Sequence, residues 1–171
     1  MSRVFLGLGS NIDAHNNLRR GIDCLAQQHT LVQESPWYGS PAVGFDGPEF
    51  INLVVEIDTE QTPVALAHSL KRLEFDFGRP QHASKFSSRA LDVDILMYDQ
   101  QCGSWPTEFG TLTLPRDDIW RYAFVLRPLL DIYPQAVCPL RQRPLQADWP
   151  TLSEQPLQRL PAHWPEHSVQ A

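Results

Sequence analysis

The stretch Phe50-Ile-Asn-Leu-Val-Val-Glu-Ile-Asp58 decides the fold of this chain, because its apolar residues recur with a period of two. In a β-strand, residues two positions apart lie on the same face of the sheet. One face therefore carries Ile51, Leu53, Val55 and Ile57, and the other carries Phe50, Asn52, Val54 and Glu56. The alternation predicts a strand over residues 50–58.

A helix is predicted directly after this strand. Thr62 is a good N-cap residue, and Pro63 suits the first helical position because its missing N–H would have no partner there. Gly78 can adopt the left-handed conformation that ends many helices. Between these limits the helix has one apolar stripe, formed by Leu66, Leu70, Leu73 and Phe77.

Further strands and helices are predicted on both sides of this pair. Apolar runs predict strands over residues 3–9, 31–35 and 91–98, a helix that begins near Asp13, and a buried helix over residues 122–132. The resulting order βαββαβ predicts an α/β (α+β) fold with a ferredoxin-like sheet and helices packed on one face of it.

The length of 171 residues with 42% hydrophobic residues predicts a single core. Seven of the fifteen prolines occur from Pro134 onward, a density that excludes long helices and central strands. We therefore expect a domain over residues 1–134 and a Pro-rich C-terminal extension over residues 135–171. The extension should pack on that domain or fray from it.

The net charge and the cysteines indicate which partners the protein binds and in which cellular compartment it occurs. A net charge of −6 argues against nucleic acid, and no apolar run approaches the roughly 20 residues of a membrane span. The N-terminus has no leader-like apolar region. Cys24, Cys102 and Cys138 are widely spaced and odd in number, which favours reduced thiols. We expect a cytoplasmic monomer that contacts neither nucleic acid nor membrane.

Two aspartates, Asp92 and Asp94, share one face of the strand predicted over residues 91–98. Residues two apart in a strand lie roughly 7 Å from each other, which leaves room for a cation between the carboxylates. Magnesium typically takes one or two carboxylates together with water and substrate phosphates. The alternative for an isolated Asp-x-Asp is a solvated strand edge with two acids.

The residues before these aspartates are basic. No carboxylate occurs between Phe77 and Leu91, whereas this segment contains Arg79, His82, Lys85 and Arg89. Two like charges cost stability unless a cation offsets them, and arginines beside a metal pair are typical of phosphoryl transfer. The alternative for Arg89 is a salt bridge to Asp92 alone.

Phe50 and Asn52 share a strand face beside the loop Ser40-Pro-Ala-Val-Gly44. A stacking ring next to an amide suits a flat heterocycle with hydrogen-bonding edges. The alternative is a core phenylalanine and a turn-capping asparagine. A glycine-containing segment, residues 7–11, matches neither nucleotide-loop template and is interpreted as a tight turn from strand to helix.

Together these motifs resemble the 6-hydroxymethyl-7,8-dihydropterin pyrophosphokinase family, over residues 7 to about 134. The family signature is an arginine followed by Leu-Asp-x-Asp-Ile. The matching motifs are Gly7-Leu-Gly-Ser-Asn11, Ser40-Pro-x-x-Gly44, Phe50-Ile-Asn52, Glu74, Gly78-Arg79, Arg89-Ala-Leu-Asp-Val-Asp-Ile95, Leu114-Pro115 and Ala123-Phe124-Val-Leu126.

The resemblance implies an enzyme of folate biosynthesis that transfers the pyrophosphate of ATP to the hydroxymethyl group of a reduced pterin and releases AMP. It implies two magnesium ions held by Asp92 and Asp94, catalytic arginines Arg79 and Arg89, and closure of a loop over residues 80–88. The implied pterin contacts are Ser40, Val43, Phe50, Asn52, Phe86 and Phe124. The implied ATP contacts are Glu74, Arg79, Arg89, Arg116 and Arg121.

The sequence departs from the family at several positions. Arg116 replaces a histidine that contacts nucleotide phosphates, and Thr111 and Tyr122 replace two arginines. Phe86 replaces a loop tryptophan. These departures leave open a degenerate paralogue that binds pterin or nucleotide without catalysis. A third alternative, an RNA-recognition module on the same fold, lacks the basic-aromatic motif and the basic charge.

Overall fold

The computed structural model describes residues 1–78 and 88–161. Its centre is a six-stranded antiparallel sheet in the order β5-β1-β4-β3-β8, and β2 pairs with β4 as well. These strands are β1 (Ser2–Ser10), β2 (Thr30–Glu34), β3 (Tyr38–Ser40), β4 (Phe50–Thr59), β5 (Asp92–Tyr98) and β8 (Gln158–Arg159). With α1 and α2 between them, β1, β2, β4 and β5 form the predicted ferredoxin-like βαββαβ unit.

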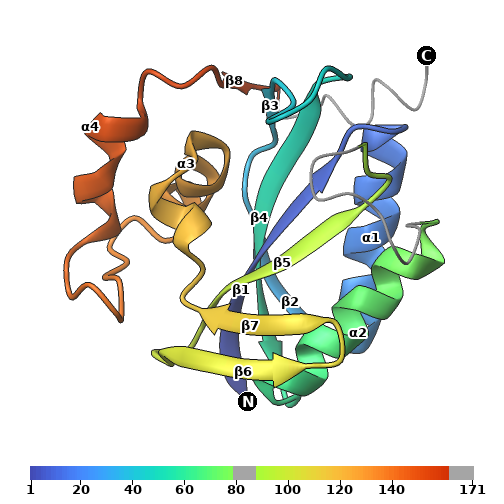
Figure 1. Cartoon of the computed structure of the whole chain (residues 1–171), viewed down its shortest axis with the longest axis vertical. Helices are drawn as coiled ribbons and strands as arrows, with labels where there is room; N and C mark the ends of the chain where they lie inside the picture. The colour runs from blue at the N-terminus through green and yellow to red at the C-terminus, as the bar shows by residue number, and fades with distance from the viewer. Residues whose placement is uncertain (79–87, 162–171) are drawn as a thin grey trace.

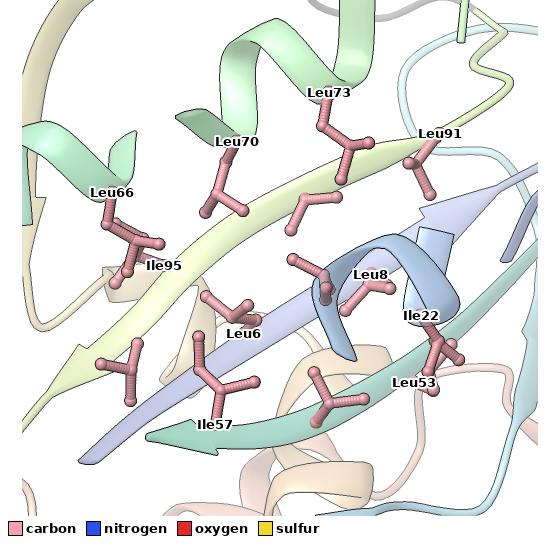
Figure 2. Packing of buried hydrophobic residues seen from close by; sticks show 14 of the residues in the cluster. Leu6, Leu8, Ile22, Leu53, Ile57, Leu66, Leu70, Leu73, Leu91 and Ile95 are labelled. Carbon is pink, nitrogen blue, oxygen red and sulfur yellow. The ribbon is translucent and has the colours of Figure 1, made fainter. Parts of the chain in front are cut away.

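The first face of the sheet is covered by α1 (Ala14–Gln28) and α2 (Pro63–Asp76), as Figure 1 shows. The odd-numbered side chains of β4 point to this face, as their alternation predicts. They pack with leucines of both helices in one cluster, part of which is drawn in Figure 2, including Leu6, Leu8, Ile22, Leu53, Ile57, Leu66, Leu70 and Leu73.

The helix α2 begins and ends where its sequence predicts. The Thr62 hydroxyl accepts a hydrogen bond from the Ala65 N–H at 3.2 Å, and Pro63 occupies the first helical position. Gly78 follows the helix with φ +96°, a conformation that costs other residues a steric penalty. No helix in the two described ranges combines the length and apolar character needed to cross a membrane.

The opposite face of the sheet is covered too, which differs from the prediction of helices on one face. There α3 (Ala123–Ile132) lies against the sheet, and α4 (Trp149–Leu152) lies on the outer side of α3 (Figure 1). The 3₁₀ turn η2 (Leu145–Asp148) contacts both of these helices. Phe5 of β1 and Val54 of β4 point to this side and are buried in a second cluster. These apolar side chains would otherwise be exposed, because a sheet with two apolar faces needs a layer on each.

Four short elements were not predicted from the sequence. A separate hairpin joins β6 (Gly103–Thr107) to β7 (Gly110–Leu114), and a 3₁₀ turn, η1 (Asp117–Trp120), follows it. The hairpin side chains are largely exposed, so they show no apolar alternation. Strand β3 occurs inside a Pro- and Gly-rich stretch over residues 36–48, a composition that does not indicate a strand.

Residues 135–161 contain only the short elements that their prolines predict. Ala136, Cys138, Leu145 and Leu152 of this segment are nevertheless buried in the second cluster. Strand β8 adds two residues to the edge of β3, and the Leu160 N–H donates a hydrogen bond to the Trp37 carbonyl at 2.9 Å. The described part of the extension is therefore packed on the sheet domain.

Candidate active site

A cavity of about 560 Å³ opens over the sheet, between α3, α2 and the β6–β7 hairpin. Its floor is formed by β1, β4 and β5. Ten of the residues singled out in the sequence line this one cavity: Ser40, Val43, Phe50, Asn52, Arg89, Asp92, Asp94, Arg116, Arg121 and Phe124. Residues that are distant in the sequence are thus brought together around one ligand-sized space.

The paired aspartates lie on β5 with their side chains toward the cavity. Leu91, Val93 and Ile95 alternate with them and are buried in the first core cluster, so the strand is held from below. Across the ladder, Asp92 lies opposite Gly9 and Asp94 opposite Gly7. The two glycines carry no side chain, so the cavity floor beside the carboxylates stays open.

This position corrects one interpretation of the sequence. Gly7 and Gly9 were read as part of a tight turn, but both lie within β1. A Cβ added at Gly9 would lie 2.6 Å from the Asn52 Oδ1, a distance that real Cβ atoms do not tolerate. Glycine is required here for the close approach of a functional side chain rather than for a turn.

The charge balance around Asp94 favours a bound cation. Burial and the neighbouring Asp92 carboxylate raise the pKa of Asp94 to about 6, although the Arg116 guanidinium acts in the opposite direction. The Arg116 Nη2 lies 3.8 Å from the Asp94 Oδ2, and its Nε donates a hydrogen bond to the Asp118 Oδ2 at 3.0 Å. The carboxylates of Asp92, Asp94 and Asp118 thus lie close to the Arg116 guanidinium.

The donor set fits magnesium. Magnesium prefers oxygen ligands and typically takes one or two carboxylates, with substrate phosphates and water completing the octahedron. Asp92 and Asp94 offer two carboxylates on one rigid strand, open to the cavity. Within residues 1–78 and 88–161, no group of three or more His, Cys, Asp or Glu side chains could hold a metal.

Arg89 is held at the edge of the cavity by its backbone. Its N–H donates to the Asn11 Oδ1 at 2.8 Å, and its carbonyl accepts from the Asn11 N–H at 3.0 Å. Its side chain is almost wholly buried, and the Nη1 donates to the Ser88 carbonyl at 3.2 Å. The Ser10–Asn11 turn therefore fixes where this guanidinium meets the cavity.

The aromatic end of the cavity is built from β3, β4 and the start of α3. Ser40 lies opposite Phe50 in the ladder, and the Asn52 Nδ2 donates to the Ser40 Oγ at 3.3 Å. On the other side, Tyr122 and Phe124 stack with their ring centroids 5.0 Å apart. Rings on two walls and an amide on the floor suit a flat polar heterocycle.

Glu74 is placed differently from the other predicted site residues, because it is not among the residues that line the cavity. It is only 1% exposed, and its carboxylate accepts a hydrogen bond from the Val93 N–H at 2.8 Å. It also forms an ion pair with Lys71 at 2.9 Å. Glu74 therefore connects α2 to the aspartate strand and holds Lys71, which does line the cavity.

Sequence reasoning missed several residues of the cavity wall. Lys71 was overlooked because one lysine on the polar side of a helix gives no signal by itself. Phe109, at the hairpin turn, lines the cavity and makes edge contacts with His68 and Phe75 at centroid distances of 5.8 and 5.5 Å. Its role depends on a hairpin that the sequence pattern did not reveal. Tyr122 was noted only as a lost arginine.

Two predicted site residues, Arg79 and Phe86, lie outside the described residues, as does nearly all of the loop whose closure the resemblance implies. They remain predictions.

The fold is similar to that of solved HPPK-DHPS structures, one of them from Plasmodium falciparum. The wild-type protein with pteroate matches with a TM-score of 0.72 at 11% identity, over 88% of this chain and 44% of that chain. A second structure, described as HPPK-DHPS in complex with substrates, matches with a TM-score of 0.71 at 12% identity, over 88% of this chain and 43% of that one. At these identities the likeness shows the fold alone.

The cavity brings two carboxylates and basic side chains together with aromatic rings and an amide. The family model 7,8-dihydro-6-hydroxymethylpterin-pyrophosphokinase (HPPK) matches residues 5–134. A 2-amino-4-hydroxy-6-hydroxymethyldihydropteridine pyrophosphokinase from Haemophilus influenzae is 34% identical over 83% of this chain and 88% of the relative. The chain belongs to the HPPK family.

Some relatives are longer than this chain. The mitochondrial folate synthesis bifunctional protein of Pisum sativum is 33% identical over 78% of this chain, but the match covers only 26% of the pea protein. The chain likewise spans less than half of each of the two HPPK-DHPS chains. The similarity extends only to the matched part of these proteins.

Proposed function

We propose that this chain transfers the pyrophosphate of ATP to the hydroxymethyl group of 6-hydroxymethyl-7,8-dihydropterin in folate biosynthesis, and that AMP is the second product. The observation that carries the proposal is the cavity itself. It combines a pair of carboxylates, three arginines and an aromatic, amide-lined end in one space. Pyrophosphate transfer needs all three, because a polyphosphate and a heterocyclic alcohol must meet there.

The reaction requires one bond to form and one to break. The hydroxymethyl oxygen attacks the β-phosphorus of ATP in line, and the bond from that phosphorus to the oxygen shared with the α-phosphate breaks, so that AMP leaves. The hydroxyl proton passes to solvent or to a phosphate oxygen. Two magnesium ions, held by Asp92 and Asp94 together with phosphate oxygens, would neutralise the charge on the transferred group.

The cavity residues divide into an anion-binding part and a pterin-binding part. Arg89, Arg116, Arg121 and Lys71 bind phosphate oxygens, and Glu74 acts indirectly by holding Lys71. At the other end Phe50 and Phe124 enclose the pterin ring, Asn52 bonds its edge, and Ser40 and Val43 complete the contact. Arg79 and Phe86 join these groups by their resemblance to the family.

We place the reaction in the cytoplasm and the protein in a monomeric state. All three cysteines are free thiols in the structure, which supports a reducing compartment. Gel filtration with light scattering measures the molar mass in solution, which should equal the 19.5 kDa of one chain.

The central experiment incubates the protein with ATP, magnesium and the hydroxymethyl pterin and identifies the nucleotide product. AMP release that requires both pterin and magnesium is expected. ADP instead of AMP would indicate an ordinary kinase and would contradict the proposal. Pterin binding without any nucleotide product would identify the degenerate paralogue, the alternative that the sequence departures raise.

Phe50→Ala and Asn52→Ala are each expected to weaken pterin binding, by about 0.5–1.5 kcal/mol for a lost ring contact or hydrogen bond. ATP binding should not change, because both side chains lie at the aromatic end of the cavity. Calorimetry with the pterin and with a non-hydrolysable ATP analogue separates the two effects. Unchanged pterin affinity in both variants would contradict this placement.

Gly9→Ala is expected to weaken pterin binding as well, because the added methyl group meets the Asn52 side chain at the cavity floor. The new Cβ would lie 2.6 Å from the Asn52 Oδ1 and would displace the amide. The expected loss is about 1 kcal/mol, the value of one hydrogen bond.

Gly39→Ala in β3, on the other side of β4, is the matched control. A Cβ there meets only the Ile51 Cδ1, at an ordinary 3.8 Å, so pterin affinity should stay at the wild-type value. Equal losses in the two glycine variants would show that the sheet, rather than Asn52, is responsible.

A further inference from the structure

Gln155, a residue of the C-terminal extension, forms two hydrogen bonds to the start of α3. Its Oε1 accepts from the Ala123 N–H at 2.7 Å, and its Nε2 donates to the Arg121 carbonyl at 3.0 Å. One amide side chain thus bridges the two backbone groups on either side of Tyr122. Gln155 lies beyond residue 134, where the match to the family model ends.

The first of these bonds satisfies a backbone group that the helix itself leaves without a partner. Ala123 is the first residue of α3, so its N–H has no acceptor within the helix. The N-cap residue, Tyr122, provides no side-chain cap. Ala123 is 1% exposed, so an alternative partner from solvent is not at hand. Gln155 therefore acts as an external cap for α3.

The second bond fixes the orientation of the same peptide segment. A backbone held at the Arg121 carbonyl and at the Ala123 N–H cannot rotate freely about Tyr122. Tyr122 lies within this segment and Phe124 comes directly after it. Their rings stack with an interplanar angle of 26°, and both residues line the cavity. The position of this aromatic wall depends on two hydrogen bonds from outside the helix.

Gln155 is itself held in place by the extension. Its N–H donates to the Leu152 carbonyl at 3.0 Å, and Leu152 is buried in the second core cluster with Leu126 and Leu129 of α3. The extension is thus anchored to the helix whose N-terminus the glutamine caps. The backbone of Gln155 is therefore fixed, and this fixes the position from which its side chain reaches the backbone beside Tyr122.

We propose that Gln155 is a positioning residue for pterin recognition, and that the C-terminal extension thereby forms part of the active site's architecture. The inference rests on the proposed function, because it assigns the Tyr122–Phe124 wall to the pterin. It assigns no contact with the ligand to Gln155 itself. Without the amide, the start of α3 loosens and the aromatic wall loses its fixed position.

The test compares Gln155→Met, which keeps the side-chain length but removes both hydrogen bonds, with the wild type. The dissociation constant of the pterin is expected to rise about three- to tenfold, as the loss of one or two hydrogen bonds would produce. The affinity for a non-hydrolysable ATP analogue and the kcat at saturating pterin should stay within twofold. Hydrogen exchange of the amides over residues 121–126 should become faster.

Leu145→Val is the matched control for general destabilisation. Leu145 is fully buried in the same extension and the same cluster, but its aliphatic side chain forms no hydrogen bond and does not line the cavity. It should lower the melting temperature and leave pterin affinity unchanged. Gln155→Glu, which keeps the acceptor for Ala123 but cannot donate to Arg121, replaces Gln155→Met if that variant does not fold.

Pterin affinity within twofold of wild type in the Gln155 variant would overturn the inference. So would an equal loss in Leu145→Val, or a loss confined to the ATP analogue. A wild-type protein that binds no pterin would overturn the proposed function and this inference together. Wild-type binding with an unaffected variant would overturn only the role of Gln155.

Discussion

Asp92→Asn and Asp94→Asn are each expected to lower magnesium-dependent AMP release by at least about three orders of magnitude, the scale of losing preorganised charge stabilisation in a phosphoryl-transfer site. Each change replaces an anionic ligand by a neutral amide, while the strand that carries it stays anchored through its buried neighbours, Val93 and Ile95. The measurement is AMP formation over a range of magnesium concentrations. Near-normal turnover in both variants would contradict the metal assignment.

The same substitutions should stabilise the metal-free protein. Asp92 and Asp94 repel each other, and this repulsion with burial raises the pKa of Asp94 to about 6. One pKa unit corresponds to about 1.4 kcal/mol, but the Asp94 side chain is partly exposed and solvent screens the interaction, so the expected gain is about 1 kcal/mol. Thermal unfolding in the presence of a chelator measures it. Magnesium with ATP should then stabilise the wild type and fail to stabilise the variants.

Arg116→Ala is expected to lower nucleotide affinity by about 1.5–3 kcal/mol, the value of a charge-assisted contact to phosphate. In the structure this guanidinium bonds Asp118 and lies 3.8 Å from Asp94, so it is held at the cavity wall beside the metal ligands. Pterin affinity should remain at the wild-type value, because the aromatic end is not touched. Calorimetry with the ATP analogue and the pterin separates these effects.

Arg116→His introduces the residue type that the resemblance to the family implies at this position, and it should recover part of the lost affinity. Recovery should be greater at lower pH, because imidazolium carries its charge only near and below its usual pKa of about 6.5. If the wild type binds no ATP and Arg116→His creates binding, the chain is a degenerate paralogue that has kept only its pterin site. That outcome would contradict the enzyme proposal.

Much of the sheet was predictable because the relevant signals are local. Alternation along residues 50–58 assigned both faces of β4, and Thr62, Pro63 and Gly78 defined the ends of α2. The hairpin of β6 and β7 was not predictable in this way, since its side chains are mostly exposed and show no apolar period. The layer on the second face depends on contacts between distant segments, which no local pattern records.

The site was predictable to the extent that motifs share a strand or a short loop. Each motif consists of two residues that are two positions apart, Asp92 and Asp94 in one strand and Phe50 and Asn52 in another. The two members of each pair therefore share a face, because side chains in a strand alternate with a period of two. The residue type of Glu74 matched the family, but its burial beneath the cavity followed only from three-dimensional packing. Lys71, Phe109 and Gln155 reach the site through tertiary contacts. Their sequence neighbours give no indication of this.

The pairing of β8 with β3 has a consequence for synthesis of the chain. About 120 residues separate β3 from Leu160, and a ribosome adds roughly 5–20 residues per second, so the outer edge of β3 stays open for roughly 6–24 seconds after its own translation. An open strand edge is a template for pairing with other chains. A product truncated before Gln158 would keep that edge open and should aggregate during expression.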